Sequence, residues 1–209
     1  SRGIDLVRLS TLSSELTSID QRPDQLTPAV DNRAQIWSLP RKANEALQVH
    51  DVTGRLIFGA TGWLSSGEHL AFGVSREGGR LAILLKTKSG ATVAYVSAIK
   101  RDDLGNPVGL GIPRRVGADV VGMRSLSWSG ANSLATIAVG TTGIDTPTNI
   151  YIGGDSIEMT AITDAIAMVA QVDSSSTYVL DKNRLLFEYR GLSWVAVESD
   201  VIAAHYVGN

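Results

Sequence analysis

The chain has 209 residues, of which 44% are hydrophobic and 19% charged, and this balance predicts a globular fold with a buried core. Nineteen Lys and Arg against 21 Asp and Glu give a formal net charge of −2, without long runs of like charge, which argues against binding to nucleic-acid phosphates. Because there is no cysteine, disulfides, thiolate nucleophiles and cysteine-ligated metal centres are excluded.

The predicted elements are short strands joined by polar turns. In chain order, residues 4–9 form a plausible first strand, and residues 13–19 and 43–49 could each form a helical turn. Four hairpin-like units accompany them, each with a polar turn followed by an apolar run. The turns contain Gly or Asn, which favour the positive φ that hairpin turns need. The units lie at residues 31–37, 75–85, 129–139 and 181–189, the first being the faintest.

The spacing of these units predicts a β-propeller. The first apolar residues after the turns are Ile36, Leu81, Leu134 and Leu185, which are 45, 53 and 51 residues apart. Such a period, with about four strands in each repeat, is typical of propeller blades. The runs within 81–85 and 134–139 are continuously apolar, as expected for strands covered on both faces by neighbouring blades.

We therefore predict an all-β, antiparallel β-propeller with about four recognisable blades, either complete or part of a ring of five or more. Outer strands are expected at 92–99, 112–116, 149–152 and 157–160. Residues 1–209 are expected to form a single propeller domain or a fragment of one. Residues 1–20 would then be the remnant of a truncated blade, and truncation would leave an open sheet edge prone to pairing with another chain.

The motifs of catalysis are weak. The sequence has no Walker loop, no Gly-x-Gly-x-x-Gly after a strand and no His-Glu-x-x-His. Ser75 approximates a nucleophile elbow but lacks the second Gly, which favours a hairpin-turn serine. His50, His69 and His205 show no spacing for a shared metal. We predict no catalytic, cofactor-binding or metal-binding residue and no enzyme activity, although a hydrolase with groups gathered at the channel mouth stays an alternative.

Two further residue groups invite a functional interpretation. Asp102 and Asp103 resemble the start of a calcium loop, but no acidic residue stands near its twelfth position, so a solvated turn is favoured there, as it is at Asp155.

Of the four tryptophans, Trp37 and Trp128 are expected to fill gaps between blades, Trp63 to be more exposed in a loop, and Trp194 to lie on an outer strand. An exposed Trp63 beside a cleft would favour a sugar site.

The order of several segments resembles the C-terminal β-propeller domain of LpqB, a family of actinobacterial lipoproteins. The Arg-Asp-x-x-Gly-x-Pro loop of residues 101–107, placed after the strongest hairpin, carries the resemblance. The other matching segments are 31–39, 74–85, 93–96, 113–116, 121–128, 133–139 and 185–194. The resemblance implies a lipoprotein signal, an acylated cysteine and a GerM-type domain upstream of residue 1, and thus anchoring at the outer face of the cell membrane.

The family resemblance also supplies a function and a partner. It implies a non-enzymatic extracytoplasmic interaction domain that acts on the sensor region of an MtrB-type histidine kinase, within the MtrA/MtrB two-component system of cell-envelope and division regulation. The alternative hypothesis is a propeller that binds a carbohydrate or peptidoglycan fragment. No cofactor and no nucleic acid is expected, and the partner-facing residues stay open.

Overall fold

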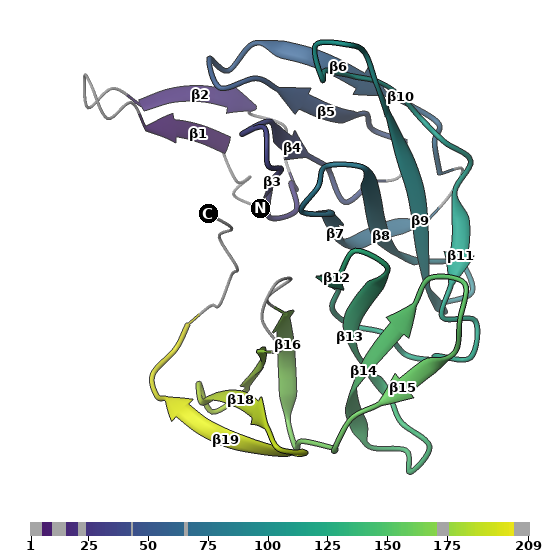
Figure 1. Cartoon of the computed structure of the whole chain (residues 1–209), viewed down its shortest axis with the longest axis vertical. Helices are drawn as coiled ribbons and strands as arrows, with labels where there is room; N and C mark the ends of the chain where they lie inside the picture. The colour runs from purple at the N-terminus through teal and green to yellow at the C-terminus, as the bar shows by residue number, and fades with distance from the viewer. Residues whose placement is uncertain are drawn as a thin grey trace.

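The computed structural model describes residues 6–9, 16–20, 24–42, 44–64, 67–170 and 176–202, and every element in these ranges is a β-strand. The strands form one two-stranded hairpin and four antiparallel sheets (Figure 1). The hairpin consists of β1 (Leu6–Leu9) and β2 (Leu16–Asp20). The prediction of an all-β propeller is thereby confirmed at the level of strand content and sheet order.

Each of the four sheets is a meander of consecutive strands, which is the architecture of a propeller blade. Blade 1 contains β3 (Ala29–Val30), β4 (Ile36–Ser38), β5 (Leu47–His50) and β6 (Leu56–Ala60). Blade 2 contains β7 (Glu68–Val74), β8 (Arg80–Lys86), β9 (Thr92–Arg101) and β10 (Pro107–Leu110), with β11 (Arg114–Val116) also paired to β9.

The second half of the chain repeats this arrangement. Blade 3 contains β12 (Ser127–Gly130), β13 (Ser133–Val139), β14 (Asp145–Tyr151) and β15 (Ser156–Glu158). Blade 4 contains β16 (Ala165–Ala170), β17 (Thr177–Asp181), β18 (Leu186–Arg190) and β19 (Ser193–Glu198). Figure 1 shows the four blades along an arc that is open between blade 4 and blade 1, with the β1–β2 hairpin at the upper left of this opening.

Three apolar clusters hold successive blades together. The first joins blades 1 and 2, the second joins blades 2 and 3, and the third joins blades 3 and 4. In β8, Leu81 and Ile83 belong to the first cluster, whereas Ala82 and Leu84 belong to the second. This alternation explains the continuously apolar run, because both faces of the strand are covered. The predicted double coverage of β8 and β13 is confirmed.

Two local predictions were wrong. The helical turns expected at 13–19 and 43–49 give way to β2 and β5. In β5, Leu47, Val49 and His50 are buried whereas Gln48 is half-buried, and the strand pairs with both β4 and β6. Two turns of apparent helical period are too short to compete with pairing on both sides.

The predicted alignment of the fourth repeat was wrong, because it lies one strand too late in its blade. In blades 1 to 3 the predicted turn joins the first and second strands, but residues 181–185 join β17 and β18, the second and third strands of blade 4. The counterpart of β8 and β13 is therefore β17, and the apolar run that begins at Leu185 occupies β18, whose side chains are only half-buried except for exposed Arg190.

A shared turn chemistry explains the displacement. Four hairpins begin with an Asp whose Oδ1 accepts the amide four residues later: Asp31, Asp51, Asp102 and Asp181. The residue three positions after each Asp has positive φ, and these residues are Ala34, Gly54, Gly105 and Arg184. Because the same turn occurs at three different places in a blade, its sequence does not reveal which strands it joins.

Arg184→Gly is expected to stabilise the protein by about 0.5–1 kcal/mol. Arg184 is exposed and holds a φ of 66°, which costs a side-chain-bearing residue about 1–2 kcal/mol, partly offset by the greater freedom of Gly in the unfolded chain. Urea denaturation of the variant and wild type measures the difference. Gly54→Ala, at the same turn position with a φ of 85°, is the matched control and should destabilise; equal stability of all three proteins would contradict the turn geometry.

Candidate functional site

Arg101 links blade 2 to the first turn of blade 1. It ends β9, and its Nη2 lies 2.6 Å from Oδ2 of Asp31, in the turn between β3 and β4. Its Nη1 donates to Oε1 of Gln35 at 2.5 Å and to the carbonyl of Gly105 at 2.6 Å, while its Nε donates to the carbonyl of Gly78 at 2.9 Å. The side chain of Arg101 is 11% exposed and that of Asp31 is 0% exposed, so this is a buried ion pair.

The carboxylate of Asp31 is fully used. Its Oδ1 accepts the amides of Arg33 and Gln35, both at 3.0 Å, and its Oδ2 accepts the indole N–H of Trp37 at 3.1 Å in addition to Arg101. The guanidinium of Arg101 also lies 5.9 Å from the centre of the Trp37 ring. Charge-assisted hydrogen bonds of this number offset the cost of burying both charges. The network therefore fixes the β9–β10 hairpin against blade 1.

Exposed apolar side chains lie on two neighbouring hairpins at this end of the molecule. The β5–β6 and β9–β10 turns join equivalent strands of adjacent blades, and β6 contacts β10. We name the hairpin-end surface by its four members, Val52, Leu56, Leu104 and Val108, which are 48%, 52%, 86% and 59% exposed. Apolar side chains on loops that a rigid scaffold holds are typical of interaction surfaces.

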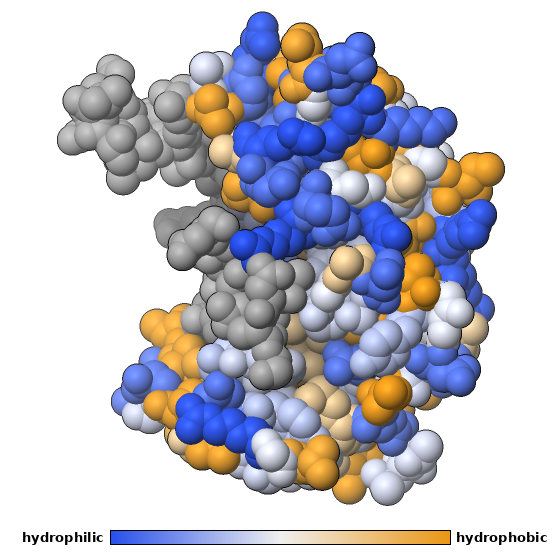
Figure 2. Space-filling view, viewed as in Figure 1, coloured by the Kyte–Doolittle hydropathy of each residue, from blue (hydrophilic) through white to orange (hydrophobic). Residues whose placement is uncertain are grey.

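Charged groups surround the hairpin-end surface. Asp51 forms an ion pair with Arg55 at 3.2 Å, and Asp102 and Asp103 lie in the β9–β10 turn. A hydrogen bond from the Thr53 hydroxyl, the largest cause, lowers the pKa of Asp51 to about 2, so this carboxylate is charged at neutral pH. Figure 2 shows hydrophobic and hydrophilic side chains intermixed at the top of the molecule, where Figure 1 places β6 and β10.

The residues that the sequence singled out for catalysis or calcium lie in hairpin turns. Ser75 is completely buried, and its Oγ accepts the amide of Arg80 at 3.0 Å. Asp102 closes its own turn by accepting the amide of Asn106 at 2.7 Å, and exposed Asp155 lies in the turn between β14 and β15. The structural roles favoured for these three residues match their positions.

The histidines are dispersed. His50 lies buried in β5 and His69 lies buried in β7, where its Nδ1 donates to the carbonyl of Pro40 at 2.7 Å. His205 falls outside the described residues. Within the described ranges, no three His, Asp or Glu side chains are grouped so as to hold a metal ion, and no helix is long and apolar enough to cross a membrane.

His69 is expected to make the fold sensitive to mild acid. Burial, the largest cause, lowers the pKa of His69 below its ordinary value of 6.5, and the hydrogen bond to Pro40 opposes this only in part. Below pH 6.5 the unfolded chain therefore binds a proton that the folded chain resists, so stability falls as the pH drops through this range. The measurement is the urea midpoint against pH for wild type and His69→Gln; the same slope in both would contradict the assignment.

The tryptophans support the blade packing. Trp37 and Trp128 are 0% and 5% exposed, and the indole N–H of Trp128 donates to the carbonyl of Gly73 in the neighbouring blade at 3.0 Å. Trp194 lies on β19, as predicted, and packs against Tyr189 with ring centres 4.8 Å apart. Trp63 is half-buried, packs against the first cluster and donates to the carbonyl of Gly111 at 3.3 Å. An indole held in this way gives no support to the sugar-binding alternative.

The Asp31–Arg101 pair and the hairpin-end surface are not evident in the sequence. Arg101 stands out there only as the first residue of the loop that carries the family resemblance, and its partner is 70 positions away along the chain. The available signal was the Asp that opens each of two hairpin turns, but nothing in the pattern distinguishes buried Asp31 from partly exposed Asp51.

Comparisons with known proteins agree with this architecture. A family model described as the lipoprotein LpqB beta-propeller domain matches residues 3–204. No curated protein sequence matches the chain. Among solved structures, the β-propeller domain of Cps50 (Swd1) from Myceliophteria thermophila is similar with a TM-score of 0.58 and 10% identity, over 86% of this chain and 60% of that one.

Two other solved structures also match this chain. A chain of the mitotic checkpoint complex matches with a TM-score of 0.51 and 10% identity, over 97% of this chain and 78% of that one. The PQQ-bound aldose sugar dehydrogenase from Streptomyces coelicolor matches with a TM-score of 0.45 and 11% identity, over 85% and 82%. The present chain spans about three fifths of the Cps50 domain, and identities this low show the fold alone.

Proposed function

Because the chain belongs to the LpqB lipoprotein β-propeller family, we propose that it is a non-enzymatic extracytoplasmic domain that binds the sensor region of an MtrB-type histidine kinase. The observation that carries the proposal is the family match over residues 3–204, which includes all four blades. In the full-length lipoprotein, a lipid anchor at the outer face of the cell membrane would place the propeller beside the extracytoplasmic part of such a kinase.

The hairpin-end surface is the proposed contact site. Leu104 and Val108 project from a hairpin whose base is fixed by the Asp31–Arg101 network, so a partner that covers them does not first have to order the loop. The surrounding charges of Asp51, Arg55 and Asp102 would form the polar rim that protein interfaces usually have.

Binding would regulate the kinase by selecting one of its conformations. The propeller shifts the kinase equilibrium only by the difference in its affinity for the two states, and a modest regulatory effect needs about 1–3 kcal/mol of such coupling. No group on the propeller has to react. A rigid surface presented at a fixed place is sufficient.

Calorimetric titration of the purified domain with the extracytoplasmic region of its cognate sensor kinase tests the proposal. We expect saturable binding, and we expect Leu104→Asp with Val108→Asp to weaken it at least about tenfold, since each change places a charge in the core of the interface. Both side chains are exposed, so these changes should leave the urea midpoint unchanged.

Ile112→Asp is the matched control. Ile112 is 87% exposed, almost the same as Leu104 at 86%, but it lies in the connection between β10 and β11, beyond the other end of β10. This variant should bind like wild type. Equal weakening by both sets of changes would remove the hairpin-end surface as the site, and the absence of binding by the wild type would contradict the proposed partner.

A further inference from the structure

Blade 4 ends in an unprotected sheet edge. Among the described strands, β19 pairs only with β18, so one side of its backbone carries N–H and C=O groups without a strand partner. It has six residues and contains no Pro, Lys or Gly. The outer strands of the other blades are shorter or carry residues that disfavour pairing. β6 has five residues including Gly59, and β15 has three residues. β10 begins at Pro107, and β11 contains the charged residues Arg114 and Arg115.

The side chains beside this edge are apolar. Val195 and Val197 are 40% and 39% exposed, whereas Trp194 packs into the third cluster on the other face. Figure 2 shows hydrophobic side chains at the lower left of the molecule, where Figure 1 places β18 and β19. A long edge strand with exposed valines is the kind that pairs with another strand.

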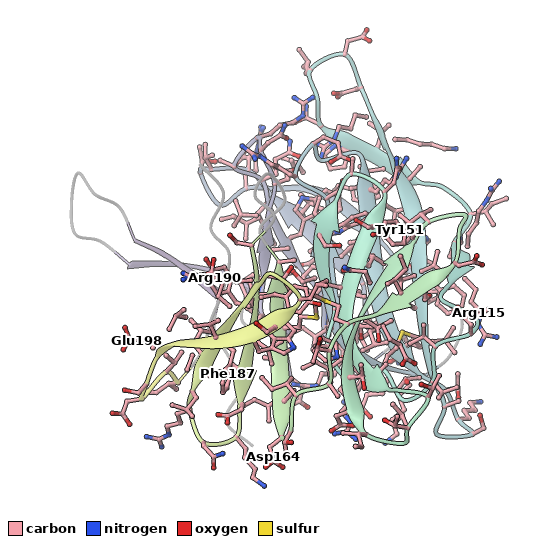
Figure 3. All side chains as sticks on the ribbon, turned by 60° about the horizontal axis from the view of Figure 1, so that its bottom comes forward. Arg115, Tyr151, Asp164, Phe187, Arg190 and Glu198 are labelled. Carbon is pink, nitrogen blue, oxygen red and sulfur yellow. The ribbon has the colours of Figure 1, made fainter. Side chains whose placement is uncertain are left out.

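Charges of opposite sign mark the two ends of the β18–β19 ladder. Arg190 pairs with Ser193 at one end, and Leu186 pairs with Glu198 at the other. Arg190 is bound to Glu188 of its own strand but keeps 61% of its side chain exposed. Figure 3 labels Arg190 and Glu198, which lie apart at the free margin of blade 4. An antiparallel copy of β19 would bring the acidic end of one molecule beside the basic end of the other.

We propose that the β19 edge is a homodimer interface, in which β19 of one molecule pairs antiparallel with β19 of a second copy. With Ser193 opposite Glu198 of the second copy, Val195 lies opposite Val195 of that copy, because the β-bulge before Glu198 puts Ser193, Val195 and Glu198 on one face of the sheet. No like charges face each other in this register. Arg190 then lies one strand inward from Ser193, on the same face as Glu198 of the second copy. The two-fold axis passes beside Val195 and makes the contact between Arg190 and Glu198 occur twice.

A charge-exchange experiment tests the dimer. Sedimentation equilibrium of the wild type over a range of concentrations should show a monomer–dimer equilibrium. Arg190→Glu and Glu198→Lys, each studied alone, should weaken dimerisation roughly tenfold, because each places two like-charged pairs in the interface. An equal mixture of the two variants should restore the dimer. In the mixed dimer the introduced carboxylate of one variant lies beside the introduced ammonium group of the other, and the second contact keeps the native pairing of Arg190 with Glu198.

Val195→Lys with Val197→Lys should also shift the equilibrium to monomer, whereas Ile157→Lys on β15, the outer strand of blade 3, is the matched control that should not. The mixture distinguishes the interface from a folding defect, because a destabilised variant is not rescued by another. A wild type that remains monomeric, a mixture that behaves like the two variants alone, or dimerisation of the double Lys variant at wild-type strength would each overturn the proposal.

Discussion

Asp31→Ala is expected to lower the free energy of unfolding by about 3–5 kcal/mol, since it leaves the guanidinium of Arg101 buried without its counter-charge. The same change removes the acceptor of the Arg33 and Gln35 amides and of the Trp37 indole. Urea denaturation followed by tryptophan fluorescence measures the loss, because Trp37 is completely buried at this junction.

Asp51→Ala is the matched control for Asp31→Ala. Asp51 opens the same type of hairpin turn and accepts the amides at the equivalent positions, two and four residues later, but its ion pair with Arg55 is exposed to solvent. Exposed pairs contribute little to stability, so this variant should lose much less than Asp31→Ala. Similar losses for the two variants would show that the turn, and not the buried pair, determines the stability of the junction.

A double variant measures the coupling between Asp31 and Arg101. Arg101→Met together with Asp31→Leu replaces both charges by apolar side chains, and it should be more stable than either Arg101→Met or Asp31→Leu alone. Buried charges are costly when one partner is missing, whereas an apolar pair has no unpaired charge. Losses in the double variant that equal the sum of the single losses would mean that Asp31 and Arg101 act independently.

The fold could be predicted from the sequence because its strongest signals are local. The continuously apolar runs of β8 and β13 indicate strands buried on both faces, since a half-exposed strand alternates apolar and polar residues. A hairpin turn precedes each run, and the spacing of these turns gives the period of the repeat. The position of the fourth repeat could not be predicted in the same way, because Asp181 opens a turn chemically equivalent to that of Asp31 at a different place in the blade.

The candidate site depends on contacts that no local pattern contains. The Arg101–Asp31 pair joins two blades across 70 positions, and exposure of Leu104 follows from where the β9–β10 hairpin lies relative to β6. Trp63 lies in a loop and is more exposed than Trp37 and Trp128, as predicted, but its indole N–H donates to the carbonyl of Gly111 in the next blade, a contact that no local pattern contains. Tertiary contacts of this kind determine which surface is free to bind.

Leu84→Ala is the second substitution expected to have a large effect, with a loss of about 3–5 kcal/mol. Leu84 lies in β8, is 0% exposed and belongs to the cluster between blades 2 and 3. Truncation removes buried methyl groups and leaves a cavity that strands fixed on both sides fill poorly. The urea midpoint and the heat-denaturation midpoint measure the loss.

Leu186→Ala tests whether the blades are aligned correctly. If the run that begins at Leu185 were the counterpart of β8, truncating Leu186 would be as costly as truncating Leu84. The structure instead places half-buried Leu186 in β18, the third strand of blade 4, so a loss of only about 1 kcal/mol is expected. Val179→Ala in β17, the true counterpart and completely buried, should lose more than Leu186→Ala although it removes fewer atoms. The reverse order would restore the alignment predicted from the sequence.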